Sequence, residues 1–262
     1  MNKERSSLGV VKRGMTVFDI FKLCVYVWAR YRPGFWSLVQ RMRGETDWCI
    51  TVKTPCGPAR LVFNPRYTSE LTVVDELLPG DIYMAQRKAA HFVDCGAFRG
   101  ISAIYLQDQV KATHVTAFEP QEDNFEILSR RLAKYLPGAT CVNAAVGPKN
   151  GEVMFSGGGV GGSVCAEGNL VRMLRLRDEI SASDAGLLLK MDIEGAEREV
   201  LPDLLPVLPQ ECLFFLETHF PEEPSKALVD LCREAGFAAK ECRRREEDGS
   251  DVLFIDWELQ RS

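Results

Sequence analysis

The sequence predicts an α/β fold in which helices cover both faces of a mostly parallel sheet. From His91 onward, short apolar runs alternate with segments of helical periodicity, which is the pattern of parallel strands joined by crossover helices. The last two apolar runs leave no room for such a helix between them, so they predict an antiparallel hairpin at the sheet edge. With 262 residues, 46% of them hydrophobic, the chain is long enough to bury one sizeable core.

Residues 1–90 are predicted to form an extension with helices and a β-hairpin, ahead of a ligand-binding domain over residues 91–262. The segment "MTVFDIFKLCVYVWARY" has helical spacing, but Asp19 and Lys22 interrupt it, and a membrane span needs roughly 20 apolar residues. We expect no span but a helix packed on the domain; a helix at a membrane surface or over an active site is the alternative. The following "CITVKTPCGPARLVF" predicts two strands around a Gly-Pro turn.

The second part of the chain is predicted to alternate strands and helices. Strands are expected at residues 91–95, 113–118, 139–145, 186–192 and 212–217, and helices at 100–109, 121–135, 195–205 and 224–235. The edge hairpin is expected from "FAAKEC" and "DVLFIDW", with the charged run "RRREEDGS" between them as a solvated turn. The glycine-rich segment at 155–168 is expected to be irregular and to act as a mobile cover over the site.

The stretch "FVDCGAFRG" at residues 92–100 places glycines between the first strand of the predicted domain and its helix. Backbone N–H groups and a helix N-terminus meet there at the carboxyl end of a strand, where open α/β sheets bind ligands. A dinucleotide-binding turn needs a glycine at the position of Phe98, so the stretch disfavours NAD. A tight structural turn is the alternative interpretation of Asp94, Gly96 and Gly100.

An acidic residue, Glu119, ends the next predicted strand, 23 residues after Gly96. A carboxylate at this position can accept hydrogen bonds from both hydroxyls of a ribose, and a helix cap reinforced by Pro120 is the alternative. The sequence therefore combines an acid that can bind a ribose with a glycine turn that cannot bind a pyrophosphate. This combination favours S-adenosylmethionine (SAM) over NAD. The third predicted strand carries Asn143 to Ala145, which are expected to border the adenine ring.

Charged side chains interrupt the ends of the fourth and fifth predicted strands. In "LLLKMDIEGAE", alternation places Lys190 and Asp192 on one face, and a structural salt bridge is the alternative to a cofactor and substrate site. The fifth strand ends in Glu217 and His219, and histidine is the usual base near neutral pH. We predict that His219 is the general base, that Asp192 and Glu194 orient it or the substrate, and that Lys190 tunes them electrostatically.

Five segments in this order resemble the FkbM family of SAM-dependent methyltransferases: "FVDCGAFRGISAIYL", "AFEPQEDNFEIL", "VNAAVGPKNGEVMF", "LLKMDIEGAEREVL" and "LFFLETHF". The resemblance implies a class I methyltransferase fold with SAM as cofactor, and methyl transfer to oxygen on a small molecule, sugar or glycolipid. It also implies that the Gly96–Gly100 turn shapes the methionine end of the pocket, that Glu119 holds the ribose, and that Asp192 faces the sulfonium. The predicted cofactor-binding residues are Asp94, Gly96, Ala97, Phe98, Gly100, Ser102, Glu119, Pro120, Asn143, Ala144 and Asp192.

The composition limits the expected partners and compartment. The formal net charge of -5 and the pI of about 5.4 provide no positive field for a polyanion, which disfavours nucleic acid. The nine cysteines are scattered and never spaced as CxxC, which indicates reduced thiols and a cytoplasmic location. The expected partner is therefore a small-molecule or glycan acceptor.

Three other interpretations stay open at this point. Asp192, Glu194, Glu217 and His219 offer ligands for a metal-assisted reaction, but their spacing matches no defined metal motif, so no metal site is predicted. A cofactor-binding scaffold that uses residues 1–90 to hold a partner is the second interpretation. An NAD-dependent oxidoreductase is the third.

Overall fold

The structure, a computed structural model, describes residues 47–64, 67–77, 83–85, 87–158, 161–165, 167–180, 186–247 and 251–261. The predicted N-terminal helix lies outside these ranges, so it stays a prediction. Among the helices within them, none combines the length and the apolar character that crossing a membrane requires.

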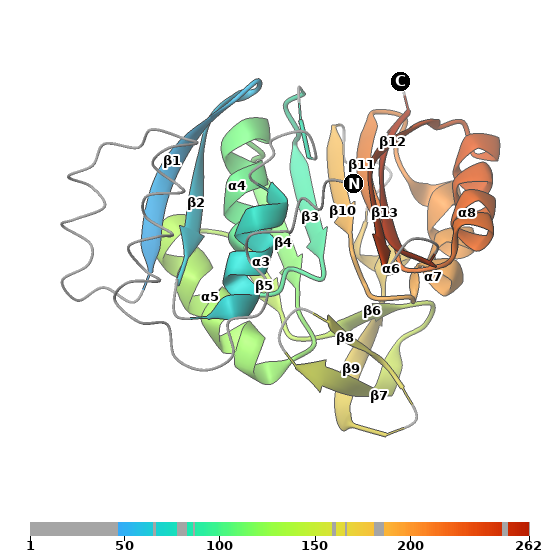
Figure 1. The fold of residues 1–262 in the computed structure, drawn as a ribbon, viewed down its shortest axis with the longest axis horizontal. Helices are drawn as coiled ribbons and strands as arrows, with labels where there is room; N and C mark the ends of the chain where they lie inside the picture. The colour runs from blue at the N-terminus through green and yellow to red at the C-terminus, as the bar shows by residue number, and fades with distance from the viewer. Residues whose placement is uncertain are drawn as a thin grey trace, which may run out of the picture.

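Seven strands form the main sheet, and the first five of them along the chain run parallel (Figure 1). In spatial order the strands are β12 (Ala238–Glu247), β13 (Asp251–Arg261), β11 (Cys212–Thr218), β10 (Leu187–Met191), β3 (His91–Cys95), β4 (His114–Phe118) and β5 (Thr140–Val142). β13 lies antiparallel between β12 and β11, because the connection that precedes it is too short for a crossover helix. The predicted fold class is therefore confirmed.

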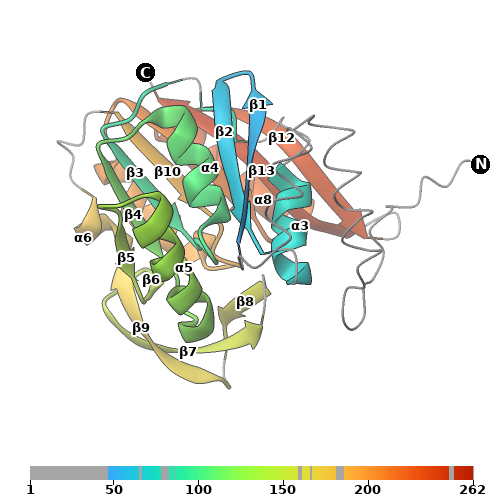
Figure 2. The same ribbon diagram turned by 90° about the vertical axis from the view of Figure 1, so that its left-hand side faces the viewer.

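Helices cover both faces of the main sheet, and alternation along its strands divides the core in two. On β3, Phe92 belongs to the core on one face and Val93 to the core on the other. Figure 2 shows α4 and α5 in front of the strands, with α8 behind them. The first face carries α3 (Thr68–Leu77), α4 (Ile101–Val110) and α5 (Glu122–Tyr135), and the second carries α6 (Leu176–Glu179), α7 (Glu197–Leu204), a 3-10 turn (Leu205–Val207) and α8 (Glu222–Glu234).

A β-hairpin packs on the first face against α4, as predicted for this segment. β1 (Trp48–Thr54) pairs with β2 (Gly57–Phe63), and the turn between them uses Gly57 at φ +113. The side chains of Leu61 and Phe63 are fully buried in the same core as those of α4. The strands β3, β4, β10 and β11 and the helices α4, α5, α7 and α8 also match the predicted elements, with small differences at their ends.

The segment predicted as one strand over residues 139–145 forms two strands in two sheets. β5 ends at Val142, and β6 (Ala145–Gly147) belongs to a separate four-stranded sheet. The amide of Asn143 donates to the carbonyl oxygens of Glu119 at 3.0 Å and Pro120 at 3.3 Å. These bonds hold the chain away from the main sheet, so the prediction of a single strand was wrong.

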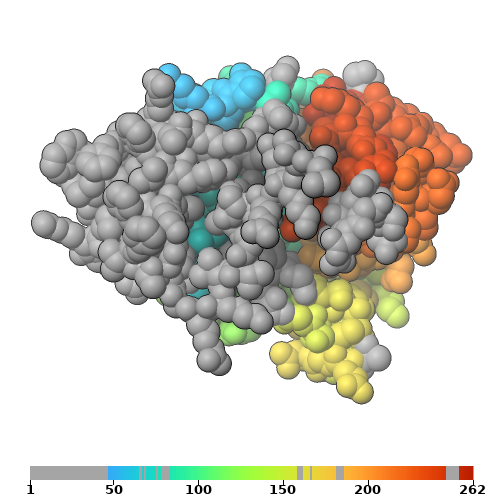
Figure 3. Space-filling view, in the orientation of Figure 1, coloured from blue at the N-terminus to red at the C-terminus, as the bar shows by residue number. Residues whose placement is uncertain are grey.

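The glycine-rich segment at 155–168 was predicted to be irregular, and its described residues instead form much of a β-hairpin. β7 (Gly151–Gly158) pairs with β8 (Gly161–Val164) and, on its other side, with β9 (Asn169–Arg175). Glycine is required for this packing at Gly168, where a Cβ would lie 2.2 Å from the carbonyl oxygen of Phe155. The resulting sheet of β6, β9, β7 and β8, called the small sheet below, projects from one edge of the molecule (yellow in Figure 3).

The charged run that was predicted as a solvated turn lies largely within a strand. Residues 243–247 continue β12, and Nε of Arg243 donates to Oδ2 of Asp256 on β13 at 2.5 Å. Because side chains alternate along a strand, one arginine of the run can face inward and form an ion pair. Residues 248–250, the last three of the run, lie outside the described ranges.

Candidate functional site

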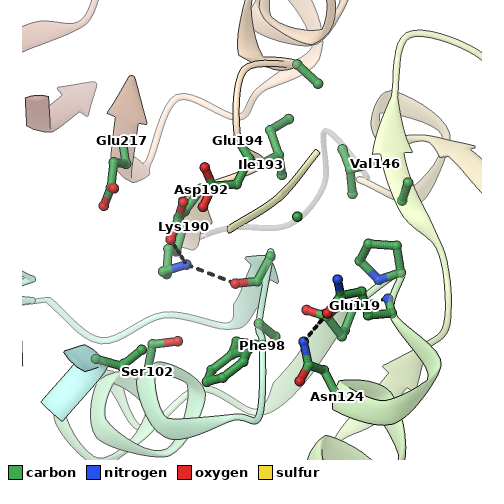
Figure 4. Close-up of a pocket in the computed structure, with 18 of the residues that line it drawn as sticks. Phe98, Ser102, Glu119, Asn124, Val146, Lys190, Asp192, Ile193, Glu194 and Glu217 are labelled. Carbon is green, nitrogen blue, oxygen red and sulfur yellow. Dashed lines mark hydrogen bonds and ion pairs between the residues drawn. The ribbon is translucent and has the colours of Figure 1, made fainter. Parts of the chain in front are cut away.

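The candidate site lies where the strand order of the main sheet reverses. β3 is flanked by β4, which follows it in the chain, and by β10, which comes much later. Open α/β sheets bind ligands at such a switch point, and a cleft opens here at the carboxyl ends of the strands. Figure 4 shows Lys190 and Asp192 on one side of this cleft, and Glu119 and Asn124 on the other.

The Gly96–Gly100 turn brings the backbone after β3 against β10. Gly96 has φ +77, and a Cβ on it would lie 1.8 Å from the carbonyl oxygen of Asp192, so no larger residue fits. Gly100 has φ +79, and a Cβ there would lie 2.9 Å from Cδ1 of Leu128 on α5. Between them Phe98 lines the cleft, where a dinucleotide turn would have a bare glycine.

Glu119 follows the last residue of β4 and lines the opposite side of the cleft with only 5% of its surface exposed. Its Oε1 accepts the backbone N–H of Gln121 at 2.9 Å. Burial raises the pKa of Glu119 to about 7, although hydrogen bonds from the backbone of Gln121 and Phe98 oppose the rise. A carboxylate in this position can accept hydrogen bonds from hydroxyl groups of a ligand.

Lys190 on β10 links this strand to β3 by an ion pair at the switch point. Its Nζ lies 3.4 Å from Oδ1 of Asp94 and 3.3 Å from Oδ2 of Asp192, and it is 3.3 Å from the carbonyl oxygen of Gly96. Burial lowers the pKa of Lys190, but the charges of Asp94 and Asp192 outweigh this effect and raise it. The hydroxyl of Ser102 donates to the other oxygen of Asp94 at 3.0 Å. These contacts fix the Gly96–Gly100 turn against β10.

His219 lies beside the cleft among four carboxylates. Its Nε2 is 3.2 Å from Glu217, 3.4 Å from Glu194 and 3.7 Å from Asp192, while its Nδ1 is 3.4 Å from the buried Glu197. Burial lowers the pKa of the imidazole, but its hydrogen bonds with Glu197 and Glu217 outweigh this and raise the pKa to about 12. In this arrangement the surrounding carboxylates favour the protonated form of His219.

Most of the predicted site residues come together around one cleft. Those that line it are Gly96, Ala97, Phe98, Ser102, Glu119, Pro120, Ala144, Lys190, Asp192 and Glu194. Asp94 lies beneath Lys190 and Ser102, and Gly100 is the N-cap of α4. Asn143 lines a neighbouring groove, and His219 contacts the cleft residues without lining the cleft.

Several residues of the cleft were not singled out from the sequence. Glu76, Tyr83, Asn124, Phe155 and Arg243 all line it. Asn124 had a detectable signal, since it is a polar residue one turn into a predicted helix that follows Glu119. Phe155 and Arg243 lay in two of the three segments whose structure was predicted wrongly. Glu76 and Tyr83 come from a part of the chain with weak periodicity.

Several residues around this cleft have a strained backbone conformation with positive φ. Among the described residues, four that are not glycine have a positive φ, and three of them line the cleft: Tyr83 at +58, Phe98 at +50 and Glu194 at +55. The left-handed conformation costs such residues about 1–2 kcal/mol each. The packing around the cleft therefore holds these three side chains in place against a local conformational preference.

Comparisons with known proteins found similarity at the level of solved structures. No family model matches the chain, and no curated protein matches it. The methyltransferase FkbM from Methylobacillus flagellatus KT aligns with a TM-score of 0.45 and 21% identity over 65% of this chain and 44% of its own. M. jannaschii TYW2 in complex with AdoMet aligns at 0.47, with 12% identity over 84% of this chain and 88% of its own. An rRNA methylase from Streptococcus thermophilus aligns at 0.45, with 11% identity over 71% of this chain and 95% of its own.

Proposed function

We propose that this chain is a SAM-dependent methyltransferase of the FkbM type that methylates a hydroxyl oxygen on a small molecule, sugar or glycolipid. One observation carries the proposal. Across the cleft, the buried carboxylate of Glu119 faces a glycine turn in which Phe98 occupies the place that a pyrophosphate would need. This combination suits a ribose that carries no second nucleotide.

The two sides of the cleft suit the two ends of SAM. Glu119 is positioned to accept hydrogen bonds from the ribose, and the buried side chains of Ala144 and Val146 offer an apolar wall for adenine. On the β10 side, Asp192 stands beside the close backbone contact at Gly96 and suits the ammonium group of the amino-acid end. When bound, SAM supplies an electrophilic methyl group on a positively charged sulfur. The carboxylates around it favour this positive charge.

The remaining part of the cleft is acidic, which supports a hydroxylated acceptor without phosphate. Glu76, Glu194 and Glu217 line it together with the aromatic rings of Tyr83 and Phe155. Carboxylates accept hydrogen bonds from hydroxyl groups but repel phosphates, and aromatic rings pack well on apolar faces of sugars and other small molecules. The same charge makes a nucleic-acid acceptor a poor fit.

The side chains at the ends of β10 and β11 are the ones placed to remove the proton from the acceptor hydroxyl. His219 was predicted as the base, and this stays a prediction. Its ring does not line the cleft, and the surrounding carboxylates favour its protonated form, so a second assignment fits the geometry better. We assign His219 to holding Asp192 and Glu194, which it contacts at 3.7 Å and 3.4 Å. These two carboxylates face the cleft and are the groups able to orient the acceptor hydroxyl and accept its proton.

Replacing Glu119 with glutamine is expected to weaken SAM binding about 10- to 100-fold, since hydrogen bonds to a charged group contribute about 1.5–3 kcal/mol. Isothermal titration calorimetry with SAM at pH 8 measures the change. The matched control is Glu122→Gln, which alters an exposed carboxylate three residues away and should leave the affinity unchanged. Equal affinities for Glu119→Gln and the control would remove Glu119 from the cofactor site.

The raised pKa of Glu119 predicts how stability and SAM binding depend on pH. Its pKa rises from 4.5 in the unfolded chain to about 7 in the folded protein, so the folded state binds more protons between these values. The free energy of unfolding therefore falls as pH rises from 4.5 through 7, whereas SAM affinity rises because the ionised carboxylate is the better acceptor. Urea denaturation and calorimetry across this range should show both trends, and Glu119→Gln should flatten them.

The proposed reaction is tested by incubating the protein with radiolabelled SAM and a panel of acceptors. The panel contains hydroxylated small molecules, monosaccharides, glycolipids and structured RNA. Label transfer to a hydroxylated, phosphate-free acceptor is the expected result. Transfer to RNA alone would contradict the assigned acceptor class while leaving the cofactor assignment intact.

A further inference from the structure

We propose that Asp192, Glu194 and His219 form a binding site for a divalent cation at the acceptor end of the cleft. The use of such a cation to bind the acceptor hydroxyl rests on the proposed function, but the cation site itself does not. One ligand atom from each of the three residues, a carboxylate oxygen from each acid and a nitrogen of His219, lies within 4.8 Å of the others. Metal–ligand distances of about 2.1 Å place the ligand atoms of one ion about 3–4 Å apart, which is close to the spacing found here.

The first argument is that three carboxylates converge on one donor. Oxygens of Glu217, Glu194 and Asp192 lie 3.2, 3.4 and 3.7 Å from the same nitrogen, Nε2 of His219. That nitrogen carries at most one hydrogen, so it can donate to only one of the three. A metal ion in place of that hydrogen can bind several oxygens at once, which matches the convergence better than a proton does.

The second argument is an excess of negative charge. At this end of the sheet, Lys190 pairs with Asp94 and Asp192, and Arg243 pairs with Asp256. Glu194 has His219 as its one ion-pair partner among the described residues, and His219 also faces the carboxylates of Glu197 and Glu217. Six carboxylates therefore surround three cationic side chains. A divalent cation that takes the place of the His219 proton would reduce this excess from three negative charges to two.

The third argument is a buried carboxylate behind the histidine. Glu197 has no exposed side-chain surface, and its Oε1 accepts the backbone N–H groups of Ile193 and Gly195 and faces Nδ1 of His219 at 3.4 Å. Its other oxygen, Oε2, has no hydrogen-bond partner among the described residues. Metal-binding histidines commonly donate their second ring N–H to a carboxylate in this way, which orients the free nitrogen toward the ion.

The ligand set indicates the class of cation and what it would do. Two carboxylates and one imidazole suit a divalent ion of intermediate hardness, such as Mn²⁺. The side chains of Asp192 and Glu194 are each 27% exposed, so the ion would keep open positions toward the cleft. An acceptor hydroxyl bound there would lose its proton more readily. Asp192 and Glu194 would then act as ligands, and the proton would pass to Glu217, whose carboxylate also lines the cleft.

The experiment measures Mn²⁺ binding by electron paramagnetic resonance on the full chain without SAM. We expect saturable binding of one equivalent by the unaltered protein and binding weakened at least about tenfold in Glu194→Gln. The matched control, Glu223→Gln, removes a carboxylate from an 87% exposed side chain and should bind as the unaltered protein does. Absence of saturable binding, or equal binding by Glu194→Gln, would overturn the proposal.

Thermal unfolding provides a second measurement, which shows whether a variant that does not bind Mn²⁺ is still folded. Without metal, Glu194→Gln should unfold at the same temperature as the unaltered protein or higher, because it removes one charge from a crowded cluster. Added Mn²⁺ should raise the unfolding temperature of the unaltered protein and much less that of the variant. If Glu194→Gln does not fold, Asp192→Asn provides the same comparison.

Failure of the cation site and failure of the proposed function are distinguishable. Calorimetry with SAM in the presence of EDTA tests the cofactor site alone. SAM binding without Mn²⁺ binding would refute the cation site and preserve the methyltransferase proposal. Mn²⁺ binding that Glu194→Gln weakens, in a protein that does not bind SAM, would preserve the site and refute its use in methyl transfer.

Discussion

Replacing Glu70 with alanine is expected to lower the free energy of unfolding by about 3–5 kcal/mol, because it removes one partner of a buried ion-pair network. Glu70 is fully buried on α3, and its Oε2 accepts the backbone N–H of Asn64 at 2.7 Å and a guanidinium N–H of Arg131 at 2.9 Å. Its Oε1 accepts a hydrogen bond from Arg99 at 3.2 Å. The alanine variant would remove the carboxylate that accepts the backbone N–H of Asn64 and would leave Arg131 with Asp47 as its remaining carboxylate.

Urea denaturation followed by circular dichroism measures this loss. Glu223→Ala, at an 87% exposed side chain, is the control and should change stability by no more than about 0.5 kcal/mol. Glu70→Gln keeps an acceptor for Asn64 and should cost less than Glu70→Ala. A loss below about 1 kcal/mol for Glu70→Ala would show that the network contributes little net stability.

Replacing Gly96 with alanine is expected to abolish measurable SAM binding and to destabilise the fold by about 3 kcal/mol. The left-handed conformation at φ +77 costs a residue with a Cβ about 1–2 kcal/mol, and overpacking adds about 1–3 kcal/mol. The overpacking is severe because the new Cβ would lie 1.8 Å from the carbonyl oxygen of Asp192, which is backbone and cannot rotate away. The Gly96–Gly100 turn must then move off β10, and both sides of the cleft separate.

The control for this variant isolates the conformational cost from the collision. Gly138 has φ +99, and a Cβ on it would have no neighbour within 4 Å. Gly138→Ala should therefore lose about 1–2 kcal/mol of stability and keep its SAM affinity. Calorimetry and urea denaturation on both variants provide the comparison. Normal SAM binding by Gly96→Ala would contradict the assigned role of the turn.

The sequence allowed the main sheet to be predicted because its strands are short apolar runs bounded by turns. β3 and β10 lie in the centre of the sheet, so almost every side chain they carry is buried and most of these side chains are apolar. The small sheet could not be predicted in the same way. The glycines of β7 and β8 have little strand preference of their own, and their pairing with each other and with β9 depends on contacts across the fold.

The positions of Asp94, Gly96 and Glu119 were easier to predict from the sequence than the surroundings of His219. Asp94, Gly96 and Glu119 stand at strand ends, where chain order alone brings them to one edge of the sheet. The surroundings of His219 come instead from β10, α7 and β11, and the pattern of no single segment shows that four carboxylates meet at one ring. The inward orientation of Arg243 could not be predicted from the charged run that contains it, because this orientation depends on pairing with Asp256 across the hairpin.

The small sheet interrupts the chain between β5 and β10, and its members Phe155, Gly162 and Val164 reach the cleft wall. β4, which leads to Glu119, and β10, which leads to Asp192, both lie outside this inserted segment. Under the proposed function, substitutions in β7 and β8 would therefore change the acceptor wall of the cleft and leave Glu119, Asp192 and the pairing of β6 with β9 in place. If the chain has the proposed function, a lineage built on this scaffold can acquire new acceptors by such changes while the residues assigned to SAM stay under unchanged selection.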